Sequence, residues 1–134
     1  MLPTLPIVPT QFYQLFVNLL SNSLKYSKED VPVHIKIETS LISGGEIRDV
    51  RARTDQNYHK ISFIDNGIGF DQSYEDKIFE LFQRLHGKSE YEGTGIGLTI
   101  CRKVVQNHNG FIMAHGQPGI GATFTIYIPV EKQS

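Results

Sequence analysis

The sequence predicts an α+β fold, a two-layer α/β sandwich in which three helices cover one face of a mixed, mostly antiparallel sheet. Apolar residues at helical spacing predict helices over 11–26, 74–85 and 95–109. Strict alternation predicts strands over 33–39 and 122–130, and two further apolar stretches, 58–64 and 111–115, complete a sheet. The strands need a cover for their apolar faces, and the order of elements lets the three helices supply it from one side.

Composition limits the class of protein. The chain has 134 residues, 40% hydrophobic and 20% charged, which fits one soluble globular domain. A net charge of −1 without a basic block argues against nucleic acid or an anionic membrane as partner. No apolar run approaches the roughly 20 residues of a membrane helix, and residues 1–3 lack the charged n-region of a signal peptide, so we expect none in this piece of chain. We therefore expect a cytoplasmic protein without direct membrane contact, although a longer parent chain could still be membrane-anchored.

The chain divides into a lead-in, one domain and a short tail. Residues 1–10 hold three of the six prolines and are interpreted as the end of a truncated upstream region. Residues 11–130 form the domain, and 131–134 are a polar tail. Thr10 is the expected N-cap of the first helix, and Gly110 the expected C′ residue of the helix over 95–109. Cys101, the single cysteine, is expected to be a buried core thiol.

The first helix carries a polar stripe of four residues, Gln14, Asn18, Asn22 and Lys25. A solvated face is the simplest interpretation, but such faces usually favour Glu and Lys. Each asparagine inside a helix costs about half a kcal/mol relative to alanine. The stripe therefore favours a functional role.

Two glycine turns are candidate ligand sites. The run Gly93-Thr94-Gly95-Ile96-Gly97-Leu98 opens a helix, where closely spaced backbone N–H groups and the helix dipole favour a phosphate. The run Asp65-Asn66-Gly67-Ile68-Gly69 follows a predicted strand. Neither turn fits a Walker A loop or a dinucleotide fingerprint, because the required glycines are absent or wrongly spaced.

Four motifs in this order resemble the catalytic and ATP-binding domain of sensor histidine kinases, within the superfamily that includes DNA gyrase B, the ninety-kilodalton heat-shock chaperones and MutL. The N box matches 18–26, the G1 box 65–69, the F box 78–84 and the G2 box 93–98. The resemblance runs from about Gln11 to Pro129. It implies the Bergerat ATP-binding fold, with ATP or ADP and Mg²⁺ as ligands.

The resemblance also implies roles for single residues around the base. Asp65 would accept a hydrogen bond from the adenine amino group, and Gly67 and Gly69 would let the backbone pass close to the base. Tyr26 would stack near the adenine. Phe79 and Phe82 are expected in the core.

Other residues would hold the metal and the phosphates. Asn22 would ligate Mg²⁺ through its amide oxygen, and Lys25 would meet phosphate as a point charge. Arg84 would pair with the terminal phosphates, next to residues 85–92, which resemble a short ATP lid. The phosphates would lie against the G2 box, which supplies Gly93, Thr94, Gly95, Gly97 and Leu98.

Asn18 indicates which reaction the domain performs. The hydrolysing relatives have a glutamate four residues before the Mg²⁺ asparagine, and an amide cannot replace it as a general base. Asn18 therefore favours phosphoryl transfer to a histidine, which needs less help from a base. The family's acceptor histidine precedes an acid, unlike any of this chain's histidines, which are His34, His59, His86, His108 and His115.

We therefore expect the acceptor to lie on a dimerisation domain of the same parent chain, with a response-regulator receiver domain as the downstream partner. This fragment is expected to be a monomer and its parent a homodimer. Two departures from the family are visible. Ser23 occupies a place where alanine is frequent, and the connection over 43–57 is longer than the minimum, which suggests a projecting hairpin.

Two other functions remain open. A nucleotide-sensing or scaffolding module would bind ATP without transfer, but the intact motif residues argue against degeneration. An ATP-hydrolysing clamp is disfavoured by Asn18.

Overall fold

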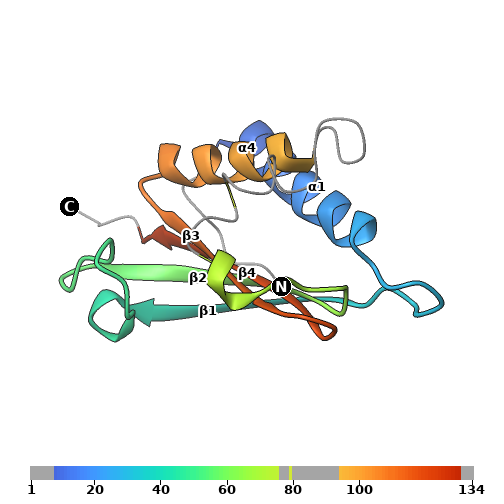
Figure 1. Ribbon diagram of the computed structural model, residues 1–134. Helices are drawn as coiled ribbons and strands as arrows, with labels where there is room; N and C mark the ends of the chain where they lie inside the picture. The colour runs from blue at the N-terminus through green and yellow to red at the C-terminus, as the bar shows by residue number, and fades with distance from the viewer. Residues whose placement is uncertain (1–7, 76–78, 80–93, 131–134) are drawn as a thin grey trace.

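The computed structural model describes residues 8–75, 79 and 94–130. A layer of helices lies over one face of a four-stranded sheet, as Figure 1 shows. The described elements are α1 (Pro9–Lys25), β1 (Ile35–Ser43), the 3₁₀ helix η1 (Gly44–Glu46), β2 (Asn57–Asp65), the 3₁₀ helix η2 (Gln72–Tyr74), α4 (Thr94–Asn107), β3 (Phe111–Gln117) and β4 (Gly121–Pro129). No described helix is both long and apolar enough to cross a bilayer.

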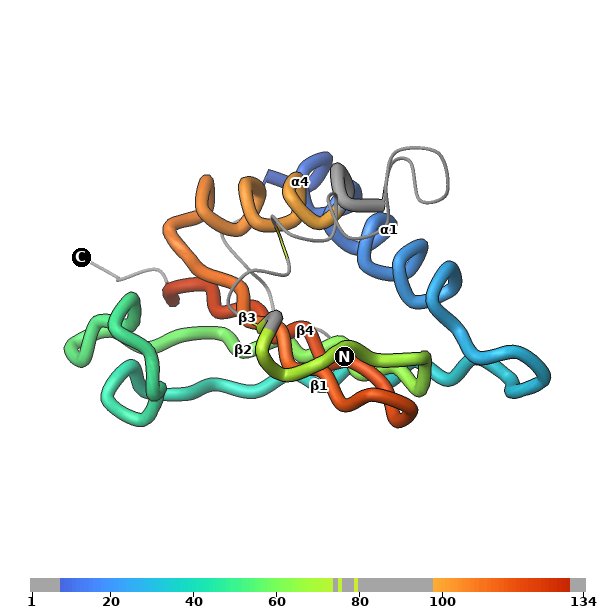
Figure 2. Tube along the Cα trace, viewed as in Figure 1, coloured from blue at the N-terminus to red at the C-terminus, as the bar shows by residue number. Residues whose placement is uncertain are grey.

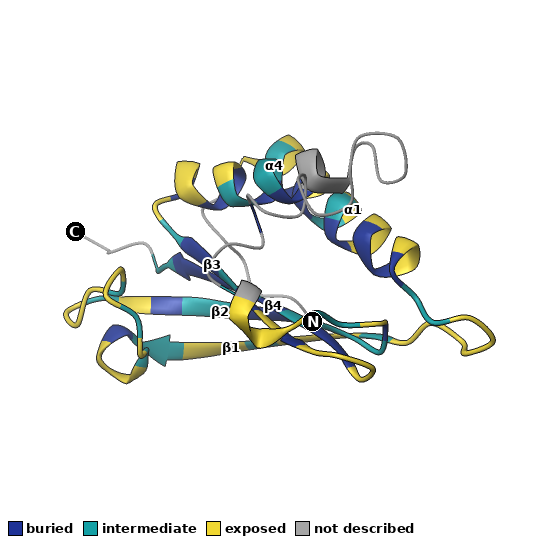
Figure 3. Ribbon diagram, in the orientation of Figure 1, coloured by how far each residue is buried: buried dark blue, intermediate teal, exposed yellow. Residues whose placement is uncertain are grey.

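The sheet has the strand order β1-β2-β4-β3, and each of its three described pairings is antiparallel. Ile61 lies opposite Ile126, and Phe63 opposite Phe124. These side chains meet the apolar faces of α1 and α4 in one core, where Figure 3 shows buried residues gathered between the two layers. The predicted sandwich is thus confirmed. Most of the helix expected over 74–85 lies outside the described residues, as does Phe82, whereas Phe79 is buried in this core as expected.

Helix α1 begins one residue earlier than its predicted cap. Pro9 occupies the first turn, and the N-cap is Val8, whose carbonyl accepts the N–H groups of Gln11 and Phe12 at 3.1 and 3.2 Å. Proline at the first helical position has the required φ and no N–H to satisfy, so it starts the helix ahead of Thr10. The prediction that Thr10 caps this helix is wrong.

Helix α4 ends in a Schellman motif. The Gly110 N–H donates to the Val105 carbonyl at 3.0 Å, and the Asn109 N–H donates to the Gln106 carbonyl, also at 3.0 Å. Asn109 has the left-handed conformation, with φ 62°, so it occupies the C′ position that the sequence assigned to Gly110. Gly110 is required for space instead, because a Cβ there would collide with the backbone carbonyl of Tyr127.

Strand β1 extends to Ser43, four residues beyond its predicted end, and forms one edge of the sheet. Its side chains Ile37 and Leu41 are 46% and 69% exposed. The register pairs them with Phe63 and His59, so they point to the helical side of the sheet, but the two described helices leave them open. Strict alternation is typical of a strand with one buried face, and β1 departs from that expectation because none of its side chains is buried.

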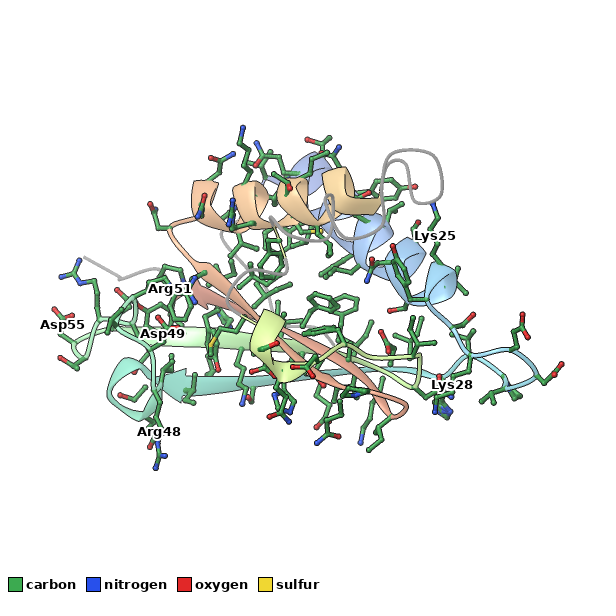
Figure 4. All side chains as sticks on the ribbon, in the orientation of Figure 1. Lys25, Lys28, Arg48, Asp49, Arg51 and Asp55 are labelled. Carbon is green, nitrogen blue, oxygen red and sulfur yellow. The ribbon has the colours of Figure 1, made fainter. Side chains whose placement is uncertain are left out.

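The connection between β1 and β2 folds back over the other face of the sheet instead of projecting. There Tyr58, Phe111 and Tyr127 form a second apolar cluster, against which Ile47 and Ala52 of the connection pack. The Arg51 guanidinium lies 4.9 Å from the centre of the Phe111 ring. Figure 2 follows this loop beside the ends of β1 and β2, and Figure 4 labels Arg51 together with Asp49 within it. The predicted projecting hairpin is wrong because these aromatic rings give the loop a surface to cover.

Candidate functional site

Helices α1 and α4 run antiparallel to one another above the sheet. Near the start of α1, the Val8 N–H donates to His108 Nε2 at 2.9 Å. Farther along α1, the Leu15 carbonyl accepts a weak hydrogen bond from the Cys101 thiol at 3.8 Å. The first turn of α4, which contains Gly95 and Gly97, therefore lies toward the C-terminal half of α1. The fold thus directs the second glycine turn toward the asparagines of the polar stripe.

The polar stripe of α1 is not uniformly solvated. Gln14 and Lys25, near its two ends, are exposed, whereas Asn22 is only 7% exposed. The Oδ1 atom of Asn22 and the Nδ2 atom of Asn18 are buried without a hydrogen-bond partner among the described residues. A buried amide atom without a partner costs about 1–3 kcal/mol, so these two atoms make Asn18 and Asn22 candidates for contact with a ligand.

Three donors hold the carboxylate of Asp65 at the end of β2. The N–H groups of Gly67 and Ala122 donate to Oδ1 at 3.0 and 3.1 Å, and the Ser23 hydroxyl donates to Oδ2 at 2.9 Å. A carboxylate offers about four acceptor positions. Among the described residues, no donor occupies the fourth position, which lies on Oδ2 beside the C-terminal turn of α1.

The turn after Asp65 passes against the end of α1. The Ile68 N–H donates to the Tyr26 carbonyl at 2.9 Å, and a Cβ on Gly67 would lie 2.5 Å from that same oxygen. Gly69 has φ +70°, which favours glycine, and a Cβ there would collide with the backbone carbonyl of Gln117. Both glycines are therefore required by the backbone itself, apart from any ligand.

A second clamp fixes the loop that follows α1. The Asn66 side chain accepts from the His34 N–H at 2.8 Å and donates to the Pro32 carbonyl at 2.9 Å. These two bonds join the glycine turn to the loop that leads from α1 into β1. The sequence offered Asn66 only as part of a motif, and this anchoring role was missed.

The remaining predicted residues have different positions. Tyr26 is buried at the end of α1, and Figure 4 shows Lys25 projecting from that end on the side away from the sheet. Leu98 is in the main core, so its side chain holds α4 in place. The Thr99 hydroxyl of α4 donates to the Phe79 carbonyl at 2.9 Å. Arg84 and Gly93 lie outside the described residues, and Thr94, Gly95 and Gly97 are placed as the first turn of α4.

Ser23 and Ala122 were missed as contributors to the site. Ala122 acts through its backbone N–H, which no side-chain pattern reveals. Ser23 could have been found, because a hydroxyl next to a buried asparagine on a core-facing helix requires a partner.

Burial also shifts the pKa of two side chains in the helical layer and the sheet. It raises the pKa of the Cys101 thiol to about 12, since the buried thiolate would lose its hydration. Burial lowers the pKa of His59 for the corresponding reason, because it disfavours the imidazolium. Away from the site, hydrogen bonds from Arg51 hold the pKa of Asp49 below its usual value. The expectation that Cys101 is a buried core thiol is confirmed.

The chain matches a known family along nearly its whole length. Residues 7–132 match the family described as histidine kinase-, DNA gyrase B-, and HSP90-like ATPase. The chain belongs to this family.

Relatives of this ATPase-family chain include cyanobacterial phytochrome A of Nostoc sp. (strain PCC 7120), 42% identical over 130 residues, which are 96% of this chain and 15% of that protein. Adaptive-response sensory kinase SasA of Synechococcus sp. (strain JA-2-3B'a(2-13)) is 33% identical over 132 residues, 98% of this chain and 31% of that protein. The chain therefore spans less than a third of these two relatives.

Among solved structures, the catalytic domain of histidine kinase ThkA in a nucleotide-free form resembles this ATPase-family chain. Its TM-score is 0.64 at 25% identity, over 92% of this chain and 68% of that one. The chain is thus homologous to the catalytic domains of histidine kinases.

Proposed function

We propose that this chain binds ATP with Mg²⁺ and transfers the γ-phosphoryl group to a histidine on a dimerisation domain outside the chain. One observation carries the proposal. The carboxylate of Asp65 is held by three protein donors and keeps one acceptor position, beside an asparagine whose buried Oδ1 has no partner among the described residues. The exocyclic amino group of adenine is a donor that fits such an acceptor.

The base would lie against the turn after β2. Asp65 accepts its amino group, and Gly67 and Gly69 keep the backbone clear of side chains there. Tyr26, buried at the end of α1, contributes an aromatic face close to the turn.

The phosphates would lie between the C-terminal half of α1 and the first turn of α4. Asn22 Oδ1 fits Mg²⁺, because that ion takes oxygen ligands and usually one or two from protein, completed by phosphates and water. Bound there, Mg²⁺ would supply charge neutralisation to the phosphates. Lys25 would add a point charge, and the N-terminal turn of α4, with Gly93, Thr94, Gly95 and Gly97, would donate backbone N–H groups. Arg84 is the proposed partner of the terminal phosphates.

In the proposed reaction an imidazole nitrogen attacks the γ-phosphorus while the bond to the β–γ bridging oxygen breaks, and ADP leaves. The protein contributes positioning and charge neutralisation. Asn18 corresponds in sequence to the glutamate that acts as general base in the hydrolysing relatives, and its amide cannot take a proton at neutral pH. The environment thus favours a nucleophile that needs little activation, which a neutral imidazole is.

Two of the described histidines are already engaged by other groups, which supports an acceptor located elsewhere. Both ring nitrogens of His108 are engaged, Nε2 by the Val8 N–H and Nδ1 by the Val104 carbonyl at 2.7 Å. His115 Nδ1 lies 2.5 Å from a carboxylate oxygen of Glu75. The proposed sequence of events is transfer to a histidine in a homodimeric parent, followed by transfer to a receiver domain of a response regulator.

Phosphoryl transfer is tested by supplying a separate dimerisation domain, with its acceptor histidine, together with γ-labelled ATP. We expect label on the acceptor domain, and none when that histidine is replaced by glutamine. Nucleotide binding without label in any pairing would favour the alternative, a sensing or scaffolding module. Release of inorganic phosphate without an acceptor would favour a hydrolysing clamp.

A further inference from the structure

A hydroxyl on α1 is bonded to the carboxylate proposed to read the base. Ser23 is 4% exposed and follows Asn22 directly in the helix. Its Oγ donates to Asp65 Oδ2 at 2.9 Å, across 42 residues of sequence. The two backbone donors to Asp65, by contrast, both reach Oδ1. Among the bonds that described residues make to this carboxylate, the one from Ser23 is therefore the only one on Oδ2, the oxygen that keeps an acceptor position for a ligand.

We propose that Ser23 is a positioning residue that sets the orientation of Asp65 toward the amino group of the nucleobase. This inference rests on the proposed ATP site. The last torsion of an aspartate side chain has broad minima, so bonds to one oxygen alone leave the plane of the carboxylate loosely defined. The bond from Ser23 fixes the second oxygen and hence the plane. With the Ser23 bond in place, one acceptor position remains on Oδ2. A donor group of the ligand can then approach this oxygen from one direction.

A nucleobase without an amino group cannot donate a hydrogen bond to the open acceptor position on Asp65 Oδ2. The contribution of Ser23 to affinity must then depend on the ligand, being present for ATP and absent for purine riboside triphosphate, which carries hydrogen in place of the 6-amino group. If Ser23 merely filled space between α1 and the sheet, its removal would weaken both ligands equally. The two ligands therefore separate positioning from packing.

The test is Ser23→Ala in the chain as it stands, with affinities for ATP and purine riboside triphosphate measured by displacement of a fluorescent ATP analogue. We expect the Kd for ATP to rise roughly three- to tenfold, a loss typical of one hydrogen bond. The Kd for purine riboside triphosphate should stay within twofold of the wild type. Ser21→Ala, at an exposed position of the same helix, is the matched control and should change neither value.

A second variant shows whether Ser23 acts through Asp65. In an Asp65→Asn background, the added Ser23→Ala change should leave the Kd for ATP unaltered, because the acceptor it orients is gone. Equal weakening of both ligands by Ser23→Ala, or no weakening of ATP binding, overturns the inference and leaves the ATP site intact. A wild-type chain that does not bind ATP, or binds both ligands equally, overturns the proposed adenine site as well.

Discussion

The carboxylate of Asp65, at the end of β2, accepts the backbone N–H of Ala122, at the start of β4, at 3.1 Å. The two residues are also direct partners in the β-ladder. The proposed base-reading group is therefore fastened to the paired strands at the middle of the sheet. Its position depends on strand register, which is set by the buried pairs Phe63–Phe124 and Ile61–Ile126 farther along the same strands.

Replacing Asp65 by asparagine tests the reading of the base. The amide oxygen can still accept the N–H groups of Gly67 and Ala122, but an NH₂ group then takes the place of Oδ2. A donor would face the adenine amino group, so we expect ATP affinity to fall by about 2 kcal/mol, roughly 30-fold. Titration with a fluorescent ATP analogue measures this change. Equal binding by the variant and the wild type, with unfolding midpoints alike, would contradict the adenine assignment.

Replacing Asn22 by alanine tests the proposed metal ligand. The variant loses the buried Oδ1 that has no described partner, so Mg²⁺ should no longer strengthen ATP binding. In EDTA the wild type and Asn22→Ala should bind ATP within about threefold of one another, because removing one ligand oxygen affects only the metal-bound complex. Gln14→Ala, on the exposed part of the same stripe, serves as control and should keep the full response to Mg²⁺. A variant that kept this response would exclude Asn22 as the ligand.

Most of the fold could be predicted because its signals are local. The alternating pattern over 122–130 predicts β4, and the helical period over 11–26 predicts α1. Both elements pack against the core with the faces that these patterns predict to be apolar. What could not be predicted depends on contacts between distant residues. The connection after β1 covers Phe111 and Tyr127, and the residues of the loop do not reveal that partner. Even the local end of α4 was misassigned, because asparagine competes with glycine for the left-handed position.

In the candidate site, too, local motifs could be predicted, whereas contacts between distant residues could not. Asp65 and Asn22 were predicted from motifs, and the structure brings their parts of the chain together through Ser23. The hydrogen bond from Ser23 joins α1 to Asp65 at the end of β2. Its partner could not be predicted, because it depends on how α1 packs against the sheet. Roles assigned to Arg84 and Gly93 stay predictions, because those residues lie outside the described part of the chain.

Replacing Gly67 by alanine tests the close approach of the turn to α1. The added Cβ would lie 2.5 Å from the Tyr26 carbonyl oxygen, so the turn must move and the nearby hydrogen bond from Ile68 must lengthen. We expect a loss of about 1–3 kcal/mol in the free energy of unfolding, measured by urea denaturation. Gly45→Ala is the control, because its Cβ would meet only the Ser43 hydroxyl, at 3.7 Å. Equal stability of the two variants would contradict the packing described for this turn.

Cys101 makes the folded domain sensitive to alkaline pH. Burial raises the pKa of its thiol to about 12, against 9.0 for a solvated thiol. The folded state therefore holds this proton more tightly than the unfolded state does. The stability linked to it is fully present below pH 9 and is lost as pH rises from about 9 toward 12.

The same thiol reports on opening of the helical layer. Because Cys101 is the single cysteine, is fully buried and lies against Leu15 of α1, a disulfide reagent can reach it only when α4 separates from α1. At pH 8 we expect slow modification of the native chain and rapid modification in urea, followed by the absorbance of the released thiolate. We expect ATP with Mg²⁺ to bind only the state in which α1 and α4 are packed together. The modification of Cys101 in the native chain should therefore slow by a factor of 1 + [ATP]/Kd. Asp65→Asn, with its roughly 30-fold higher Kd, should reduce this protection accordingly at the same ATP concentration. Modification that is fast without denaturant, or that ATP leaves unchanged in the wild type, would show that α1 and α4 do not close together over the nucleotide.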